Sequence, residues 1–251
     1  MTRRLTIPWP TPGTVGTARG DDRAAFVDHV TPLRILAVSD DVDPALHHAA
    51  NRERLGRIDL ICGCGDLPAD YLCFLGDAFV APLVYVRGNH DVGTAWERWR
   101  GSLPEPLADG MVRSDAGIRV AGFSWPSWED RRPQHSQAAA WRQVLPTALR
   151  TLGNAGEDLV MLSHVPPRGS GDVPSDPFHI GYAAYRWLAG RLRPRLWLHG
   201  HTPMAACPSW HCQLGDTEVV NVTGSVLIEL SPRPVRTPDV AGAEPARAAR
   251  R

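Results

Sequence analysis

Gly88-Asn89-His90-Asp91 follows directly after the apolar run of residues 83–87, and this tetrapeptide carries most of the information about the fold. An asparagine carbonyl can hold a hard or borderline metal ion. The adjacent histidine can stay off the metal as a proton donor, while the aspartate beside it orients the imidazole. A strand-ending turn would also contain these residues, so the segment alone leaves both interpretations open.

Polar groups also end other predicted strands along the chain, at Ser39-Asp40-Asp41, Gly65-Asp66, His164 and Gly200-His201. Open α/β sheets place their ligand sites at the carboxyl ends of strands, so these groups are expected to meet. Oxygen and nitrogen donors gathered without cysteine favour Mn, Fe, Zn or Mg. The sequence therefore predicts a metal-dependent hydrolase of the kind that cleaves phosphate esters.

Short apolar runs predict strands at residues 33–38, 58–62, 83–86, 118–123, 159–162 and 196–198. Helical patterns lie between them, near residues 45–56, 68–78, 94–100, 137–152 and 180–192. Two late runs, residues 219–222 and 226–230, predict a closing hairpin across Thr223-Gly224-Ser225. Strands that alternate with helices predict an α/β fold, and the late run of strands predicts one sheet packed on a second.

The length and charge of the chain limit its domain organisation and the kinds of partner that it attracts. The 251 residues suffice for one large domain, expected over residues 32–231, between a poorly ordered lead-in (1–31) and a disordered Arg/Pro/Ala tail (232–251). Lys plus Arg and Asp plus Glu both number 27, so no net field attracts nucleic acid or a membrane surface. Because no apolar run approaches the length of a membrane span, we expect a cytoplasmic protein without membrane contact.

The five cysteines lack zinc-finger spacing and do not suggest a disulfide framework. Cys62 and Cys64 flank Gly63 at the end of a predicted buried strand, where alternation points both to the same side. A soft metal site is one interpretation of this pair. Free cysteines are among the most buried residue types, however, so we expect core thiols.

Together these segments resemble the calcineurin-like metallophosphoesterase superfamily, whose pattern is Asp-x-His, Gly-Asp, Gly-Asn-His-Asp/Glu, a lone His and Gly-His-x-His. The resemblance covers residues 33–230, with the segments in the family's order. More narrowly, the Ser-Asp-x-Val-Asp opening at residues 39–43 is similar to that of a little-characterised bacterial branch. The resemblance implies a four-layer sandwich, in which two facing mixed β-sheets are flanked by helices with metal ions at one end.

The resemblance also implies residue roles and a cofactor. His90 would protonate the leaving alcohol with Asp91 holding it, and Asp66 would bridge two metal ions. The implied cofactor is a divalent metal, namely Mn, Fe, Zn or Mg. The implied metal ligands are Asp40, Asp66, Asn89, His164 and His201.

Two positions depart from the family pattern. Val42 stands where the first motif has its histidine, and Pro203 stands where the last motif has its second histidine. Neither side chain can bind a metal, and both lost groups would have held the same ion. We therefore expect one tight metal site and a weak second one.

Two neighbouring residues are further candidates for the metal site. Asp43 can supply a carboxylate in place of a lost histidine, but it also suits an N-cap in front of Pro44. His199 precedes Gly200 and either turns inward or packs at the end of its strand.

The loop after His164 contains three further candidates, namely Arg168, Asp176 and His179, of which the arginine and the histidine suit phosphate oxygens. The bacterial branch carries a similar Asp-x-x-His before a Gly-aromatic pair. The alternative interpretation is that Asp176 caps a helix and that the imidazole of His179 faces solvent.

The sequence thus predicts a phosphoesterase that hydrolyses a small phosphodiester or phosphomonoester by metal-activated water, with His90 as general acid. The alternative is a catalytically weakened or inactive scaffold of the same fold that binds a protein partner. Val42 and Pro203 favour that alternative, whereas the retained Asn89, His90 and His164 favour the enzyme. A nuclease is disfavoured by the balanced charge and by the lack of a basic, aromatic-lined stripe.

Overall fold

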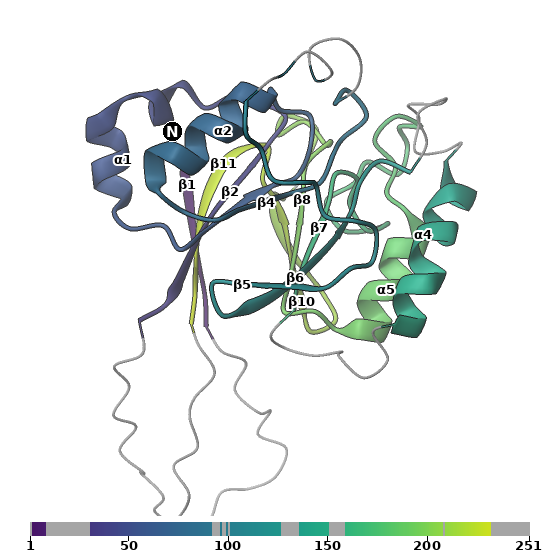
Figure 1. Ribbon diagram of the computed structural model, residues 1–251. Coiled ribbons are helices and arrows are strands. Elements are labelled where there is room, and N and C mark those ends of the chain that lie inside the picture. Colours follow the sequence, from purple (N-terminus) through teal and green to yellow (C-terminus); the bar gives the residue numbers. More distant parts are fainter. Residues whose placement is uncertain are drawn as a thin grey trace, which may run out of the picture.

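The computed structural model describes residues 2–8, 31–91, 96, 99, 101–126, 136–150, 159–207 and 209–231. Within these ranges two β-sheets face each other, with helices on both outer faces (Figure 1). This confirms the predicted α/β sandwich of helix, sheet, sheet and helix layers. The predicted tail, most of the predicted lead-in and most of the predicted helix at 94–100 lie outside the described residues.

The first sheet consists of β1 (Arg3–Ile7), β11 (Gly224–Leu230), β2 (Leu33–Ser39), β3 (Leu60–Gly63) and β4 (Leu83–Tyr85), in that order. The last three run parallel, and β11 joins β2 in the antiparallel direction. Parallel strands end at the same edge of a sheet. The segments that follow β2, β3 and β4 are therefore neighbours, as the sequence predicted.

Strand β1 pairs in parallel with β11, so Arg3–Ile7 is not part of a poorly ordered lead-in. The strand escaped prediction because only Ile7 is fully buried in it. Its remaining residues alternate between half-buried and exposed positions, and several of them are polar or charged. Such a strand has little of the apolar content on which the predictions rest.

The second sheet consists of β5 (Arg113–Asp115), β6 (Ile118–Phe123), β7 (Leu159–Ser163), β8 (Leu196–His199), β10 (Thr217–Asn221) and β9 (His211–Leu214), in that order. The four central strands β6, β7, β8 and β10 are parallel. His164 follows β7 and His201 follows β8, so both leave the sheet at one edge.

The predicted closing hairpin is wrong. Strand β10 pairs with β8 and β9 in the second sheet, whereas β11 pairs with β2 and β1 in the first. The chain crosses from one sheet to the other between them, at Val222 and Thr223. Val220 and Val226 both pack into the core between the sheets, and apolar alternation cannot distinguish two such strands from a hairpin.

Helices cover the outer faces of both sheets (Figure 1). Apolar side chains of the 3₁₀-helix η1 (Pro44–His47), α1 (Ala49–Leu55) and α2 (Ala69–Phe79) pack on the first sheet. Those of α4 (Gln137–Arg150) and α5 (Ala183–Leu192) pack on the second. In the part of the chain that is described, no helix combines the length and the apolar character that a membrane crossing requires.

Cys62 and Cys64 lie in the core between the two sheets, as expected for core thiols. Both are fully buried, and burial raises the pKa of each thiol above its ordinary value. No cluster of metal-binding side chains among the described residues includes either cysteine. The soft-metal interpretation of this pair is therefore not supported.

We predict that Val80→Gly stabilises the protein. Val80 ends α2 in the left-handed region, with φ of 51°, and its side chain is 90 % exposed. A β-branched residue is strained there and glycine is not, so the free energy of unfolding is expected to rise by about 1 kcal/mol. Urea unfolding measures this change.

Val42→Gly is the matched control. Val42 is also exposed, but it is not among the residues with positive φ. Glycine there adds only flexibility to the unfolded chain and lowers stability. Equal effects of the two substitutions would contradict the assignment of strain to Val80.

Candidate metal centre

The predicted ligand residues leave their strands through backbone turns of an uncommon kind. Asp40, Asp66 and His201 have φ of 59°, 55° and 66°, in the left-handed region that non-glycine residues rarely adopt. Such conformations cluster at functional sites because the surrounding structure must hold them. The three turns follow β2, β3 and β8, so the residues lie at the carboxyl ends of these strands.

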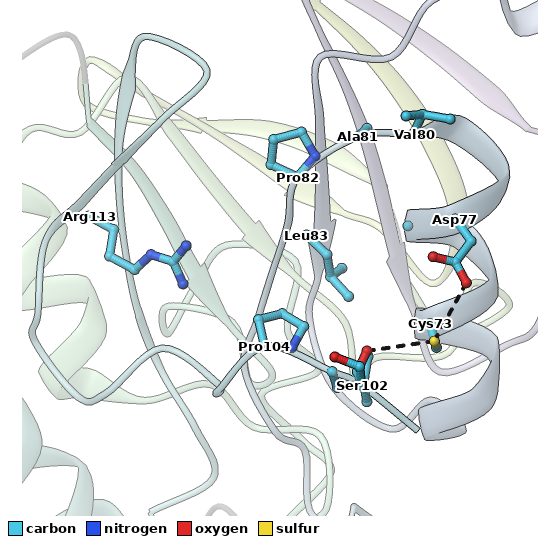
Figure 2. Close-up of a pocket in the computed structure, with 11 residues that line it drawn as sticks. Cys73, Asp77, Val80, Ala81, Pro82, Leu83, Ser102, Pro104 and Arg113 are labelled. Carbon is cyan, nitrogen blue, oxygen red and sulfur yellow. Dashed lines mark hydrogen bonds between the residues drawn. The ribbon is translucent and has the colours of Figure 1, made fainter. Parts of the chain in front are cut away.

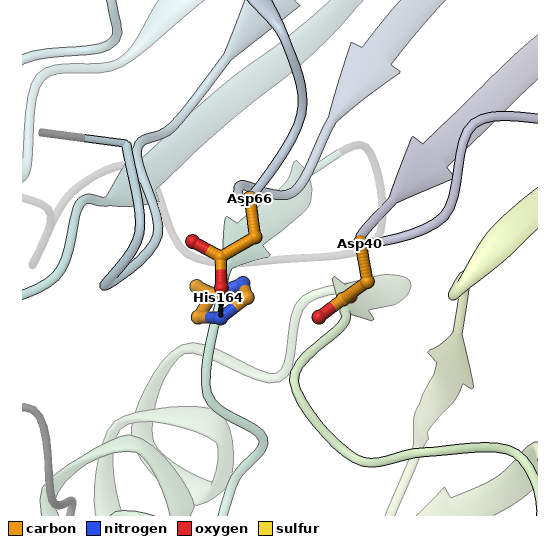
Figure 3. Close-up of side chains that lie close together, drawn as sticks. All are labelled: Asp40, Asp66 and His164. Atoms are coloured by element: carbon orange, nitrogen blue, oxygen red, sulfur yellow. Dashed lines mark ion pairs between the residues drawn. The ribbon is translucent and has the colours of Figure 1, made fainter. Parts of the chain in front are cut away.

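The side chains converge on one atom, Nε2 of His164. It lies 2.9 Å from Asn89 Oδ1, 3.1 Å from Asp66 Oδ2 and 3.1 Å from His201 Nδ1. Donor atoms of Asp40, Asp66 and His164 also lie within 4.8 Å of one another. Figure 3 shows the carboxylates of Asp66 and Asp40 directed toward the His164 ring.

Backbone carbonyls fix which nitrogen of each imidazole faces this cluster. His164 Nδ1 lies 2.9 Å from the carbonyl oxygen of Cys64, and His201 Nε2 lies 2.6 Å from that of Phe178. A carbonyl only accepts hydrogen bonds, so both of these ring nitrogens donate. In the neutral rings the other nitrogens, His164 Nε2 and His201 Nδ1, then carry lone pairs that point into the cluster.

The cluster therefore attracts positive charge. Burial disfavours a charged His164, but the carboxylates of Asp66 and Asp40 outweigh it and raise the pKa of His164 to about 9. Burial likewise raises the pKa of Asp66, but the charge and hydrogen bond of His164 hold it below its ordinary value. Burial lowers the pKa of His201 to about 3, aided by the charge of His164, so His201 keeps its lone pair.

The residues present fit a divalent metal ion. On an octahedral ion with bonds of about 2.1 Å, neighbouring ligands lie about 3.0 Å apart, close to the three separations from His164 Nε2. Two imidazole nitrogens with two side-chain oxygens suit borderline ions such as Zn, Mn or Fe. Asp66 and His164 would hold such an ion, with Asn89 and His201, which both adjoin His164 Nε2, as further ligands.

Asp40 is engaged by hydrogen bonds in this arrangement. Its carboxylate accepts the backbone N–H of His201 at 2.9 and 3.2 Å and the hydroxyl of Thr223 at 3.3 Å. Burial raises its pKa above the ordinary value. Val42 and Pro203 are exposed and supply no donor. Of the predicted first site, the described residues thus retain Asp40 and Asp66.

The resemblance implied that Asp91 holds the imidazole of His90. The structure does not show this contact among the described residues. Its Oδ2 accepts the backbone N–H groups of Asp66 and Gly88, both at 2.7 Å. Its Oδ1 accepts the backbone N–H of Leu67 and the indole N–H of Trp96, both at 3.1 Å. Two carboxylate oxygens offer about four acceptor positions, so these four donors fill them. Asp91 instead fastens two ligand-bearing loops together.

Glycine is required where these two loops meet. A Cβ on Gly65, whose φ is 93°, would lie 2.5 Å from the backbone nitrogen of Gly88. A Cβ on Gly88 would lie 2.2 Å from Oδ1 of Asp66. The same Asp66 oxygen accepts the backbone N–H of His90 at 2.7 Å, which places His90 beside the cluster.

Asp43 acts as a helix cap and His199 packs at the end of its strand, and these were the alternatives to metal binding. Asp43 caps η1 through the N–H of Ala45 at 3.0 Å, and its second oxygen accepts the hydroxyls of Ser225 and Thr2. His199 is fully buried at the end of β8, with Nδ1 2.9 Å from the carbonyl of Gly200. Burial lowers its pKa to about 4. Neither residue belongs to the donor cluster.

The loop after His164 contains the remaining candidates. Asp176 does not cap α5, which begins at Ala183 with Tyr182 as N-cap, so the capping interpretation is wrong. Asp176 Oδ2 instead lies 2.5 Å from His179 Nδ1. Arg168 donates from Nε to the carbonyl of Gly181 within its own loop.

Sequence reasoning missed two contributors to the cluster, Thr223 and the carbonyl of Phe178. Neither has a sequence signal, because one depends on the crossing between sheets and the other on a backbone atom. Trp125 is nearly fully buried, with its ring centre 5.7 Å from that of His201 and 6.3 Å from that of His164. Its ring thus lies beside both imidazoles.

A cavity of about 560 Å³ lies elsewhere, between the end of α2 and the edge of β4 (Figure 2). Its lining includes Cys73, Asp77, Pro82, Pro104 and Arg113, and none of the residues of the donor cluster. The cavity is therefore separate from the candidate metal centre.

The model of the calcineurin-like phosphoesterase family matches residues 34–205. The chain belongs to that family. No curated protein matches it. Among solved structures, the calcineurin-like chain is similar to TT1561 of Thermus thermophilus, with 18% identity, a TM-score of 0.51 and coverage of 77% of this chain and 90% of that one. This likeness supports the fold.

Two further solved structures also match the chain. One is a dimetal phosphatase from Danio rerio, with 12% identity, a TM-score of 0.48 and coverage of 78% of this chain and 88% of that one. The other is Vps29 of Entamoeba histolytica complexed with zinc, with 12% identity, a TM-score of 0.37 and coverage of 80% and 81%.

We predict that Asp91→Asn weakens both the fold and metal binding. The amide replaces one acceptor oxygen with an NH₂ group that faces N–H donors, and leaving such donors unpaired costs about 1–3 kcal/mol. Because Asp91 joins the loops of Asp66 and Asn89, the affinity for Mn²⁺ is expected to fall as well. Urea unfolding and calorimetric titration with Mn²⁺ measure the two effects.

Asp109→Asn is the matched control. Asp109 accepts the backbone N–H of Ser124 and the amide of Gln143, away from the cluster. Its replacement is expected to leave Mn²⁺ affinity unchanged. If Asp91→Asn bound Mn²⁺ as tightly as the wild type, the fastening role of Asp91 would be refuted.

Proposed function

We propose that this calcineurin-like protein is a metal-dependent phosphoesterase that hydrolyses a small phosphodiester or phosphomonoester. One observation carries the proposal: Asn89 Oδ1, Asp66 Oδ2 and His201 Nδ1 all lie within 3.1 Å of His164 Nε2, at separations suited to a bound divalent ion. Membership of the phosphoesterase family supports the same reaction.

A divalent ion held by these four residues would neutralise phosphate charge and lower the pKa of a bound water. The chain's own residues complete the proposed site. His90 follows the ligand Asn89 and is exposed, so it can give a proton to the departing oxygen. Asp66 fixes His90 by accepting its backbone N–H.

We further propose that one ion binds tightly. Asp40 retains a carboxylate beside the cluster, but its oxygens already accept the N–H of His201 and the hydroxyl of Thr223. Asp43, the carboxylate expected to replace a lost histidine, is engaged as a cap. A second ion would thus have two carboxylates and no imidazole, which favours weak binding.

The proposal includes a cytoplasmic location. All five cysteines are free, which is typical of proteins kept in a reducing compartment.

The alternative function is a scaffold that binds a protein partner and has lost catalysis. Val42 and Pro203 favour it, because both remove ligands of one predicted metal site. Metal content and turnover separate the two functions.

We predict that the purified protein binds one Mn²⁺ per chain tightly and hydrolyses bis-p-nitrophenyl phosphate or p-nitrophenyl phosphate. His164→Ala removes the central donor, so metal and activity should both be lost. His90→Ala should keep the metal while kcat falls about 10²–10⁴-fold, as expected for loss of a general acid. Metal analysis and steady-state kinetics measure these outcomes.

His47→Ala is the control, since His47 stacks on Phe74 at the surface of the first sheet's helices. It should change neither metal content nor kcat. Absence of bound metal and of turnover with Mn²⁺, Zn²⁺, Fe²⁺ and Mg²⁺ would reject the enzyme and leave the scaffold.

A further inference from the structure

The loop of residues 165–182, which joins β7 to α5, is closed by its own hydrogen bonds. The buried carboxylate of Asp172 accepts the N–H of Gly169 at 2.8 Å and that of Gly181 at 2.9 Å, so it ties the two ends together. Pro167 and Tyr182 also form a β-bridge. These contacts give the loop a fixed shape without a helix or strand of its own.

The tip of this loop is attached to the candidate metal centre. His201 donates from Nε2 to the carbonyl of Phe178 at 2.6 Å. The ring of His179, the next residue, lies with its centre 5.3 Å from the centre of the His201 ring. His179 is therefore held beside a proposed metal ligand by the backbone bond of its neighbour.

Asp176 fixes the orientation of the His179 ring. Its Oδ2 lies 2.5 Å from His179 Nδ1, and its Oδ1 accepts the N–H of Phe178 at 2.9 Å. The hydrogen bond from His179, followed by that from Phe178, lowers the pKa of Asp176, so its carboxylate is charged at neutral pH. In the described part of the chain, no hydrogen bond engages His179 Nε2. The side chains of His179 and Asp176 remain 26% and 36% exposed, so a ligand can reach this pair.

We infer that Asp176 and His179 form a carboxylate–imidazole dyad that contacts the substrate, with His179 Nε2 donating to a phosphate oxygen of the ester at the metal centre. The inference rests on the proposed phosphoesterase function. Between a carboxylate and a phosphate oxygen, the ring carries a proton on each nitrogen and donates to both anions.

A second carboxylate–histidine pair in the same protein lies outside the candidate metal centre and serves as a comparison. His211 Nε2 lies 2.5 Å from Glu218 Oε2, and the two side chains are 33% and 18% exposed. This pair joins β9 to β10, and neither residue is part of the metal-binding group among the described residues. It therefore supplies a matched control in distance, exposure and chemistry.

The test measures binding of inorganic phosphate to the Mn²⁺-loaded protein, together with hydrolysis of the two nitrophenyl esters. His179→Ala is expected to weaken phosphate binding and lower kcat/KM about ten- to a hundredfold, the effect of losing one charge-assisted hydrogen bond. Mn²⁺ affinity should be unchanged. His211→Ala should match the wild type in all three measurements.

Two conservative variants separate contact with substrate from support of the loop. His179→Asn can still donate to Asp176 but has no atom at the Nε2 position, so it should behave as His179→Ala. His179→Gln places an amide N–H near that position and should recover part of the phosphate affinity. Equal phosphate binding by wild type and His179→Ala would overturn the dyad, and so would loss of Mn²⁺ binding in both His179→Ala and His179→Asn.

Failure of the dyad and failure of the proposed function give different results. A wild type that hydrolyses neither ester, yet binds phosphate in a manner that depends on His179, would reject the phosphoesterase and uphold the dyad. If the wild type and His179→Ala hydrolyse either ester at the same rate, the phosphoesterase is upheld and the dyad is rejected.

Discussion

Nε2 of His164 lies within 3.1 Å of three other atoms that accept hydrogen bonds, and the candidate site is organised around the positive charge that this arrangement requires, from a proton or a metal ion. Lone pairs at such separations need positive charge between them. The protein prevents the imidazoles from turning away, because the carbonyls of Cys64 and Phe178 hold the opposite ring nitrogens. The high pKa of His164 is one expression of this constraint. Affinity for a divalent ion would be another.

Asp91 helps to keep these atoms close together, although it is not itself part of the cluster. Its carboxylate collects N–H groups from Gly88, Asp66 and Leu67, and so holds the turns after β3 and β4 at one distance. The close approach of Gly65 to Gly88 shows how little space separates these turns. The motif at residues 88–91 thus suggests a proton relay from its sequence. In the structure it also joins two loops through Asp91, which sequence alone does not reveal.

Sequence predicted the central strands and the edge at which their polar ends meet, because buried parallel strands leave continuous apolar runs. It missed β1, β5 and β9, which lie at sheet edges and contain few buried residues. It assigned β10 and β11 to a hairpin because both have inward-facing valines, and only pairing partners distinguish the two arrangements. Asp43 shows the same limit in the site: a cap and a ligand require the same side chain, and only the positions of Ser225 and Thr2 decide between them.

The crossing between β10 and β11 has a consequence for how the chain folds. Strand β11 inserts between β1 and β2, so the first sheet stays incomplete until the last strand of the domain is available. The same crossing brings Thr223 to Asp40. Pairings between such distant parts of a chain form slowly, since a long loop must close before they contribute. On a ribosome, the turn that bears Asp40 therefore emerges early, but its carboxylate meets His201 and Thr223 only after 161 and 183 further residues.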